Sequence, residues 1–116
     1  MKCLFILNDP PYGTERSYGA LRLAHALLKE PGTELTVFLM ADAVLCAKKG
    51  QKTPEGHYNM EHMLKRIVAG RGKVLLCGMC MDARGLDKED ILDGARRSAM
   101  DNLAAETLAA NKVLVF

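Results

Sequence analysis

Short apolar runs separated by helical patterns are the feature that most limits the folds open to this chain. Four runs, at residues 3–7, 35–40, 73–77 and 112–116, show little alternation between apolar and polar side chains. Strands of this kind are buried on both faces, as in a parallel sheet covered by helices. Parallel neighbours need long crossover connections, which are usually helices. The pattern therefore predicts an α/β fold with a mostly parallel sheet.

Helical patterns fill the segments between the runs. The first begins near Thr14, a residue suited to cap a helix, and Asp42 is placed to cap a short second one. A third runs from about residue 58 to residue 69. After an irregular crossing over 81–87, a helical stretch begins near Lys88. This alternation of strands and helices predicts βαβ units along the chain.

The size and charge of the chain argue against several classes of protein. Its 116 residues and 12.7 kDa suit one domain spanning residues 1–116. A formal net charge of +2 does not support direct nucleic-acid or membrane binding, and no apolar stretch approaches the roughly 20 residues of a membrane span. The apolar N-terminus is interrupted by Asp9-Pro10-Pro11 before any cleavage site, so we expect a cytoplasmic protein.

The cysteines carry the clearest chemical signal in the sequence. All four are expected to be reduced thiols, because the chain is large enough to fold without disulfides and shows no export signal. Two of them form Cys77-Gly78-Met79-Cys80 directly after the third apolar run. A two-residue spacer lets either sulfur attack the other, or resolve a persulfide or mixed disulfide on it. The pair therefore indicates thiol or persulfide chemistry.

The carboxyl edge of the predicted sheet is the expected position of the site. Loops that follow parallel strands meet at this edge, so residues 8–14, 40–42 and 77–85 should come together there. A reactive cysteine needs a partly exposed, electropositive setting, which backbone N–H groups or Arg84 could supply.

A zinc site and a purely structural role are the alternatives for the cysteine pair. Tetrahedral zinc needs four ligands, and the sequence offers no second cysteine pair. His57 and His62 are five residues apart, which does not align them on a helix, and His25 lies within another predicted helix. We therefore expect neither a metal nor a cofactor. Buried cysteine is also a common core residue, so a structural role stays open.

Several segments of the sequence resemble the DsrE/DsrF-like superfamily and, within it, the YchN-like branch. They are residues 8–13, Asn-Asp-Pro-Pro-Tyr-Gly; residues 21–24, Leu-Arg-Leu-Ala; residues 37–44, Val-Phe-Leu-Met-Ala-Asp-Ala-Val; residues 50–52, Gly-Gln-Lys; and residues 76–85, Leu-Cys-Gly-Met-Cys-Met-Asp-Ala-Arg-Gly. The resemblance extends through the last apolar run. The cysteine segment together with the segment at 37–44 is much more specific than either alone.

The resemblance implies a three-layer α/β/α fold with a five-stranded parallel sheet, assembled as a homotrimer or a hexamer. Better-known family members carry sulfur as a persulfide, on a cysteine that follows a strand and precedes an Arg-Gly pair. Cys77 matches, because it lies eight residues before Gly85, which follows Arg84. Cys80 is an addition shared with the YchN-like branch. The resemblance also yields candidates for substrate binding, which are Asn8, Tyr12, Gly13, Asp42 and Gly85.

Three functions follow as hypotheses. In a sulfur carrier or sulfurtransferase, Cys77 accepts sulfur, Cys80 assists its release and Arg84 stabilises the anion; a sulfur donor or acceptor protein is then the partner. In a dithiol redox protein, the two cysteines cycle through a disulfide. In a non-catalytic oligomeric binding module, the cysteines line a contact between subunits.

Overall fold

The centre of the molecule is a five-stranded, all-parallel sheet in the order β4-β3-β2-β1-β5, in a computed structural model that describes residues 1–116. The strands are β1 (Lys2–Leu7), β2 (Glu34–Leu39), β3 (Lys73–Cys77), β4 (Ala95–Ser98) and β5 (Lys112–Val115). The four apolar runs correspond to β1, β2, β3 and β5, which confirms the predicted α/β fold. Burial inside the sheet is complete or nearly so for most of β1, β2 and β3. For the fourth run the prediction of burial on both faces was wrong, because β5 lies at the edge of the sheet and is exposed along its length.

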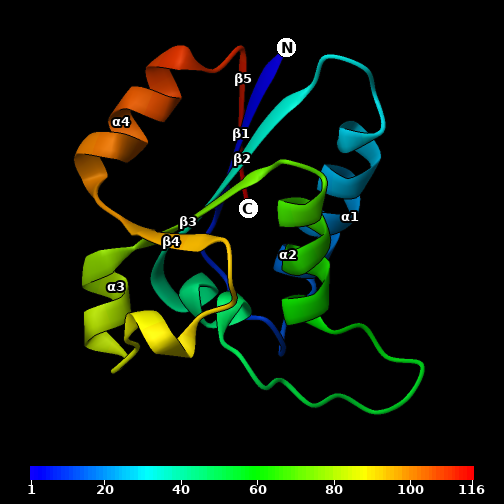
Figure 1. The fold of residues 1–116 in the computed structure, drawn as a ribbon, viewed down its shortest axis with the longest axis vertical. Coiled ribbons are helices and arrows are strands. Elements are labelled where there is room, and N and C mark those ends of the chain that lie inside the picture. The colour runs from blue at the N-terminus through cyan, green and yellow to red at the C-terminus, as the bar shows by residue number, and fades with distance from the viewer.

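Helices cover both faces of this sheet, as the three-layer expectation requires (Figure 1). The helices α1 (Arg16–Leu28) and α2 (Met60–Ala69) pack side by side on one face, and α4 (Met100–Ala109) covers the other. The short helix α3 (Gly78–Ala83) follows β3 directly, and two 3₁₀ segments, η1 (Ala41–Ala47) and η2 (Lys88–Asp90), lie in the connections. No helix combines the length and the apolar character needed to cross a bilayer.

The two faces of the sheet are packed very unequally. Beneath α1 and α2 lies a cluster of 23 buried apolar residues, whereas the α4 face has a cluster of only five, namely Leu4, Phe38, Leu75, Cys77 and Leu103. Leu103 is the one buried residue that α4 contributes. The predicted reactive cysteine therefore belongs to the thinner of the two apolar layers.

The prediction for the C-terminal third was wrong in two places. The stretch from Lys88 is not one helix, because it contains η2, then the strand β4, and only then α4. Strand β4 has the sequence Ala-Arg-Arg-Ser and lies at the edge of the sheet, so no apolar run marks it. The predicted irregular crossing is also partly helical, since α3 runs through Ala83.

The predicted helix caps were wrong as well. Residue Thr14 donates a hydrogen bond to Asp9 (3.0 Å), and the residue preceding α1 is Glu15, which makes no side-chain cap. The segment η1 starts after Met40, so Asp42 lies inside its first turn. In each case the polar side chain has another partner, Asp9 in the same loop for Thr14 and Arg84 for Asp42, which local capping patterns do not reveal.

Because Cys46 is buried, the free energy of unfolding should decrease at alkaline pH. Burial disfavours the thiolate and raises the pKa of Cys46 from 9.0 to about 12, although a hydrogen bond with Ser17 opposes this. The folded thiol therefore keeps a proton that the unfolded chain loses. Its stabilising contribution is complete below about pH 9 and is lost as the pH rises toward 12, by about 1.4 kcal/mol per pH unit.

We expect the Cys46→Ala variant to lose stability less steeply than the wild type over this pH range. The measurement is urea denaturation at several pH values from 9 to 12. Lysine and tyrosine titration is common to both proteins, so the difference in slope isolates the thiol. Parallel curves for the two proteins would contradict the assignment.

Candidate functional site at the end of strand β3

The site is built on the junction between β3 and α3. Cys77 is both the last residue of β3 and the N-cap of α3, and its sulfur accepts a hydrogen bond from the Cys80 N–H (3.4 Å). A side-chain acceptor at this position satisfies an N–H group that has no partner within the helix. The sulfur is thereby fixed at the carboxyl edge of the sheet, where the sequence predicts it.

The end of α3 explains the spacing between Cys77 and Gly85. Gly85 has a left-handed φ of 65°, its N–H donates to the Asp82 carbonyl (3.2 Å), and the next N–H donates to the Met81 carbonyl (3.0 Å). These bonds form a Schellman motif, which ends a helix at a residue that tolerates positive φ. The eight-residue interval is thus the length of one short helix with both of its ends capped.

Cys80 lies one turn into α3 and faces η1. Its sulfur accepts a hydrogen bond from the Ala41 N–H (3.2 Å), and Ala41 holds a positive φ of 50° that is uncommon for a residue with a Cβ. Burial raises the pKa of Cys80, and a side-chain hydrogen bond with Cys77 raises it further, while Ala41 and the charge of Arg84 oppose the rise. At neutral pH Cys80 is therefore a protonated thiol next to Cys77.

Arg84 and Asp42 are brought together by the fold. The Arg84 guanidinium donates from Nε to Asp42 Oδ1 (2.9 Å), and a second nitrogen donates to the Cys80 carbonyl (3.0 Å). This pair ties α3 to η1 beside Cys80. The segments 40–42 and 77–85 therefore meet as the sequence predicts.

The predicted residues of the first loop lie elsewhere. Asn8 donates to the Phe116 carbonyl (3.1 Å), and Tyr12 donates to Gln51 and accepts from the Met60 N–H. Gly13 is exposed, with a φ of 100°. Strand β2 separates β1 from β3, so the ends of these strands are about 10 Å apart. The substrate-binding role of these three residues stays a prediction.

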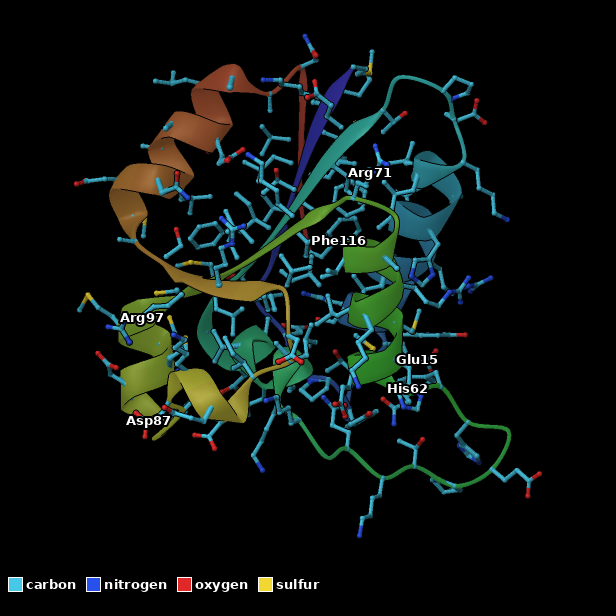
Figure 2. The ribbon with its side chains drawn as sticks, viewed as in Figure 1. Glu15, His62, Arg71, Asp87, Arg97 and Phe116 are labelled. Atoms are coloured by element: carbon cyan, nitrogen blue, oxygen red, sulfur yellow. The ribbon has the colours of Figure 1, made fainter.

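Arg97 is a residue near the site that the sequence does not reveal. It belongs to β4, and its guanidinium donates two hydrogen bonds to Asp82 of α3 (2.7 and 2.9 Å). Figure 2 shows Arg97 lying beside α3. Asp82 raises the pKa of Arg97, and Arg97 lowers the pKa of Asp82, through these hydrogen bonds. Without an apolar run to mark β4, no local pattern places this arginine next to the cysteines.

Access to the two sulfurs is limited within one chain. Cys77 is 8% exposed and Cys80 is half-buried, whereas Met79 between them is 82% exposed. A neighbouring cavity of about 370 Å³ opens between α3 and β4, and its lining includes Met81, Lys88, Ile91 and Arg97. Neither cysteine of the pair lines it. Within one chain, the Cys77 sulfur is therefore accessible only to a small group.

Comparison of the sequence with known proteins gives matches along its whole length. The sequence profile of the DsrE/DsrF-like family matches residues 1–116. Protein YchN of Escherichia coli (strain K12) is 41% identical over 116 residues, covering 99% of this chain and 98% of YchN. The protein MJ0989 of Methanocaldococcus jannaschii is 39% identical over 116 residues that cover both chains completely. A more distant relative, the sulfurtransferase TusD of Salmonella typhi, is 24% identical over 128 residues and is also covered completely.

The structural comparison agrees with the sequence comparison. The crystal structure of the ychN protein from E. coli matches with a TM-score of 0.94 over 100% of this chain and 99% of that chain. The similarity covers every strand and helix described above, including those of the β3–α3 junction.

Proposed function

Because this chain belongs to the DsrE/DsrF-like family, we propose that it is a sulfur carrier that holds sulfane sulfur as a persulfide on Cys77. The observation that supports this most is the fixed position of the Cys77 sulfur, which ends β3, caps α3 and accepts the Cys80 N–H. The distant similarity to a protein named as a sulfurtransferase adds support. All four cysteines are free, as a reducing compartment such as the cytoplasm would keep them.

Loading is a thiolate substitution at sulfur. The Cys77 thiolate attacks the terminal sulfur of a donor persulfide, a new S–S bond forms, and the S–S bond of the donor breaks. The donor leaves as a thiolate that takes up a proton from water, and the proton of the transferred S–H group stays on the new persulfide. One sulfur atom changes carrier without a net oxidant or reductant.

Release reverses this exchange toward an acceptor thiolate. The acceptor attacks the outer sulfur, and Cys77 leaves as a thiolate. Cys80 can assist because its backbone N–H donates to the Cys77 sulfur (3.4 Å) and so stabilises the leaving thiolate, while its raised pKa keeps its own thiol protonated. Arg84 acts on Cys80 through its charge and holds the Cys80 carbonyl.

A dithiol redox cycle is the second candidate, favoured by the closeness of the two cysteines across the first turn of α3, where the Cys80 N–H donates to the Cys77 sulfur (3.4 Å). In this cycle Cys80 attacks the inner sulfur of the Cys77 persulfide, a disulfide forms and hydrogen sulfide leaves. An external thiol such as glutathione must then reduce the disulfide to restore the pair. The two candidates differ in whether a Cys77–Cys80 disulfide accumulates during turnover.

Incubating the wild-type protein with inorganic polysulfide tests the proposal. We expect the intact mass to rise by one sulfur atom, with the addition located on Cys77 by peptide fragmentation and removed by a reducing thiol. Accumulation of an internal disulfide with no added sulfur would favour the redox cycle. Recovery of unmodified protein, with both cysteines inert to alkylation, would overturn both candidates and favour a binding module.

We also propose that the chain assembles as a homo-oligomer, as a trimer or hexamer. Exposed apolar side chains are concentrated on α4 and on the edge strand β5, which follow each other along the chain (Figure 1). They include Leu108, which is 88% exposed, and Val115, which is 65% exposed. Exposed apolar side chains gathered on neighbouring elements are typical of a contact with another protein surface. A second copy of the chain is the occupant proposed for it.

A charged substitution on this surface should reduce the assembly. We expect light scattering to give a multiple of the 12.7 kDa chain mass for the wild type and a smaller multiple for the double variant Leu108→Lys, Val115→Lys. The control is Leu23→Lys, which places one lysine at an exposed apolar position on α1. A wild type with the mass of one chain would contradict the proposal, and so would equal masses for the double variant and the control.

A further inference from the structure

We propose that Arg97 is the positioning residue that presents positive charge to Cys77, a role that the sequence spacing assigns to Arg84. This inference rests on the proposed function, because a cation beside Cys77 stabilises both the attacking thiolate and the persulfide anion. It gives β4, which the sequence pattern misses, a part in the chemistry. It also assigns the two arginines of the site to different sulfurs, Arg97 to Cys77 and Arg84 to Cys80.

The Arg97 guanidinium packs against Gly78, the residue that follows Cys77. A Cβ at residue 78 would lie 2.7 Å from both Cζ and Nε of Arg97, which is closer than real Cβ contacts come. Gly78 is the first residue of α3 and is not among the residues with positive φ, so its backbone does not itself require glycine. The absence of a side chain at position 78 is what lets the guanidinium rest against the first turn of α3.

The orientation of Arg97 is fixed from its other side. Both oxygens of Asp82 accept from its two terminal nitrogens, at 2.7 and 2.9 Å. This two-point geometry holds the plane of a guanidinium far better than a single contact does. Asp82 lies five residues beyond Cys77 on α3, so the helix that positions the sulfur also positions the cation.

Arg84 is committed to other groups. Its hydrogen bonds go to Asp42 and to the Cys80 carbonyl. Its charge opposes the raised pKa of Cys80, whereas the pKa of Arg97 is raised mainly by its hydrogen bonds with Asp82 and to a smaller extent by Cys77. The charged groups around the pair thus come from three elements: Asp82 of α3 with Arg84 as its C-cap, Asp42 of η1 and Arg97 of β4. Helix α4 contributes the apolar Leu103 to the cluster that holds Cys77.

Alkylation of Cys77 by iodoacetamide, followed by peptide fragmentation, measures this role without any sulfur donor. We expect Arg97→Gln to slow alkylation of Cys77 at neutral pH by about three- to tenfold, because loss of the cation disfavours the thiolate while the remaining thiolate becomes more nucleophilic. The pH–rate profile should move to higher pH. Arg97→Lys keeps the charge and should recover part of the rate.

The matched control is Arg96→Gln, which removes the same charge from the neighbouring exposed residue of β4. It should leave the rate at Cys77 within about twofold of the wild type, since Arg96 pairs with Leu75, two residues before Cys77, and the Cβ position of Gly78 meets Arg97 and not Arg96. Circular dichroism and urea denaturation of each variant establish that it is folded.

Gly78→Ala provides a second route to the same result with Arg97 intact. The added methyl group must displace the guanidinium, which is the far end of a flexible side chain, so the fold is retained while the cation moves. We expect this variant to slow alkylation of Cys77 as Arg97→Gln does. It keeps the inference testable if an Arg97 variant fails to fold.

The outcomes separate this inference from the proposed function. Equal alkylation rates in folded Arg97→Gln, Gly78→Ala and Arg96→Gln proteins would overturn the role of Arg97, and so would an Arg97→Lys variant as slow as Arg97→Gln. Failure of the wild type to take up sulfur from polysulfide would instead remove the carrier function. In that case a slower Arg97→Gln alkylation would still establish Arg97 as the cation that serves Cys77.

Discussion

Replacing Cys77 with serine is expected to abolish sulfur uptake from inorganic polysulfide. A hydroxyl group cannot hold sulfane sulfur, yet serine is a favourable N-cap residue and can still accept the Cys80 N–H. The fold should therefore survive, and the loss should be chemical. Intact mass after polysulfide treatment is the measurement, and we expect no added sulfur on the variant under conditions that fully load the wild type.

The matched variant is Cys80→Ser, which should still take up sulfur but pass it to an acceptor thiol several-fold more slowly. Serine keeps an acceptor for the Ala41 N–H but changes the proton donor beside Cys77. Release is followed by incubating the loaded protein with glutathione and recording the intact mass over time. Uptake by Cys77→Ser, or equal loss of uptake in both variants, would contradict the division of roles between the two cysteines.

Replacing Phe38 with alanine should destabilise the protein by about 3–5 kcal/mol. Phe38 has no exposed surface and fills the middle of the small cluster on the α4 face. That cluster has only five buried members, so few neighbours can move to close the space that a missing ring leaves. Urea denaturation at neutral pH measures the change in the free energy of unfolding.

The control for this prediction is Phe38→Leu, which keeps most of the apolar volume and should cost less than about 1.5 kcal/mol. A loss below about 1 kcal/mol in Phe38→Ala would mean that the α4 face contributes little to folding. Because Cys77 belongs to the same cluster, Phe38→Ala is also expected to loosen the setting of its sulfur.

The parts of the fold that the sequence predicts are those whose signal is burial. Strands β1, β2 and β3 are apolar because helices cover them on both faces, and β3 ends at Cys77 as the third apolar run does. Edge strand β4 carries no such signal, because its Ala-Arg-Arg-Ser segment is mostly exposed. Helix α3 was missed because six residues are too few to display a helical period.

The candidate site divides in the same way. Residues close in sequence to Cys77, such as Cys80 and Arg84, can be predicted as site residues from the motif and its spacing. The position of Arg97 near the cysteines depends on the pairing of β3 with β4. This pairing places Leu76 beside Arg97 and Cys77 beside Ser98. Such pairing is a property of the folded sheet, so the three-dimensional structure is needed to show which arginine contacts Gly78.

The capped helix α3 fixes both the distance and the rotation between the Cys77 sulfur and the turn at Gly85. Each residue added to or removed from an α-helix rotates its end by about 100° and moves it by about 1.5 Å. A single insertion between Cys77 and Asp82 would therefore turn Asp82 and Arg84 away from their partners on β4 and η1. A related chain with both end residues but a different interval should lack this arrangement of charges. The interval is thus a stricter criterion for recognising the site in other sequences than the cysteine pair.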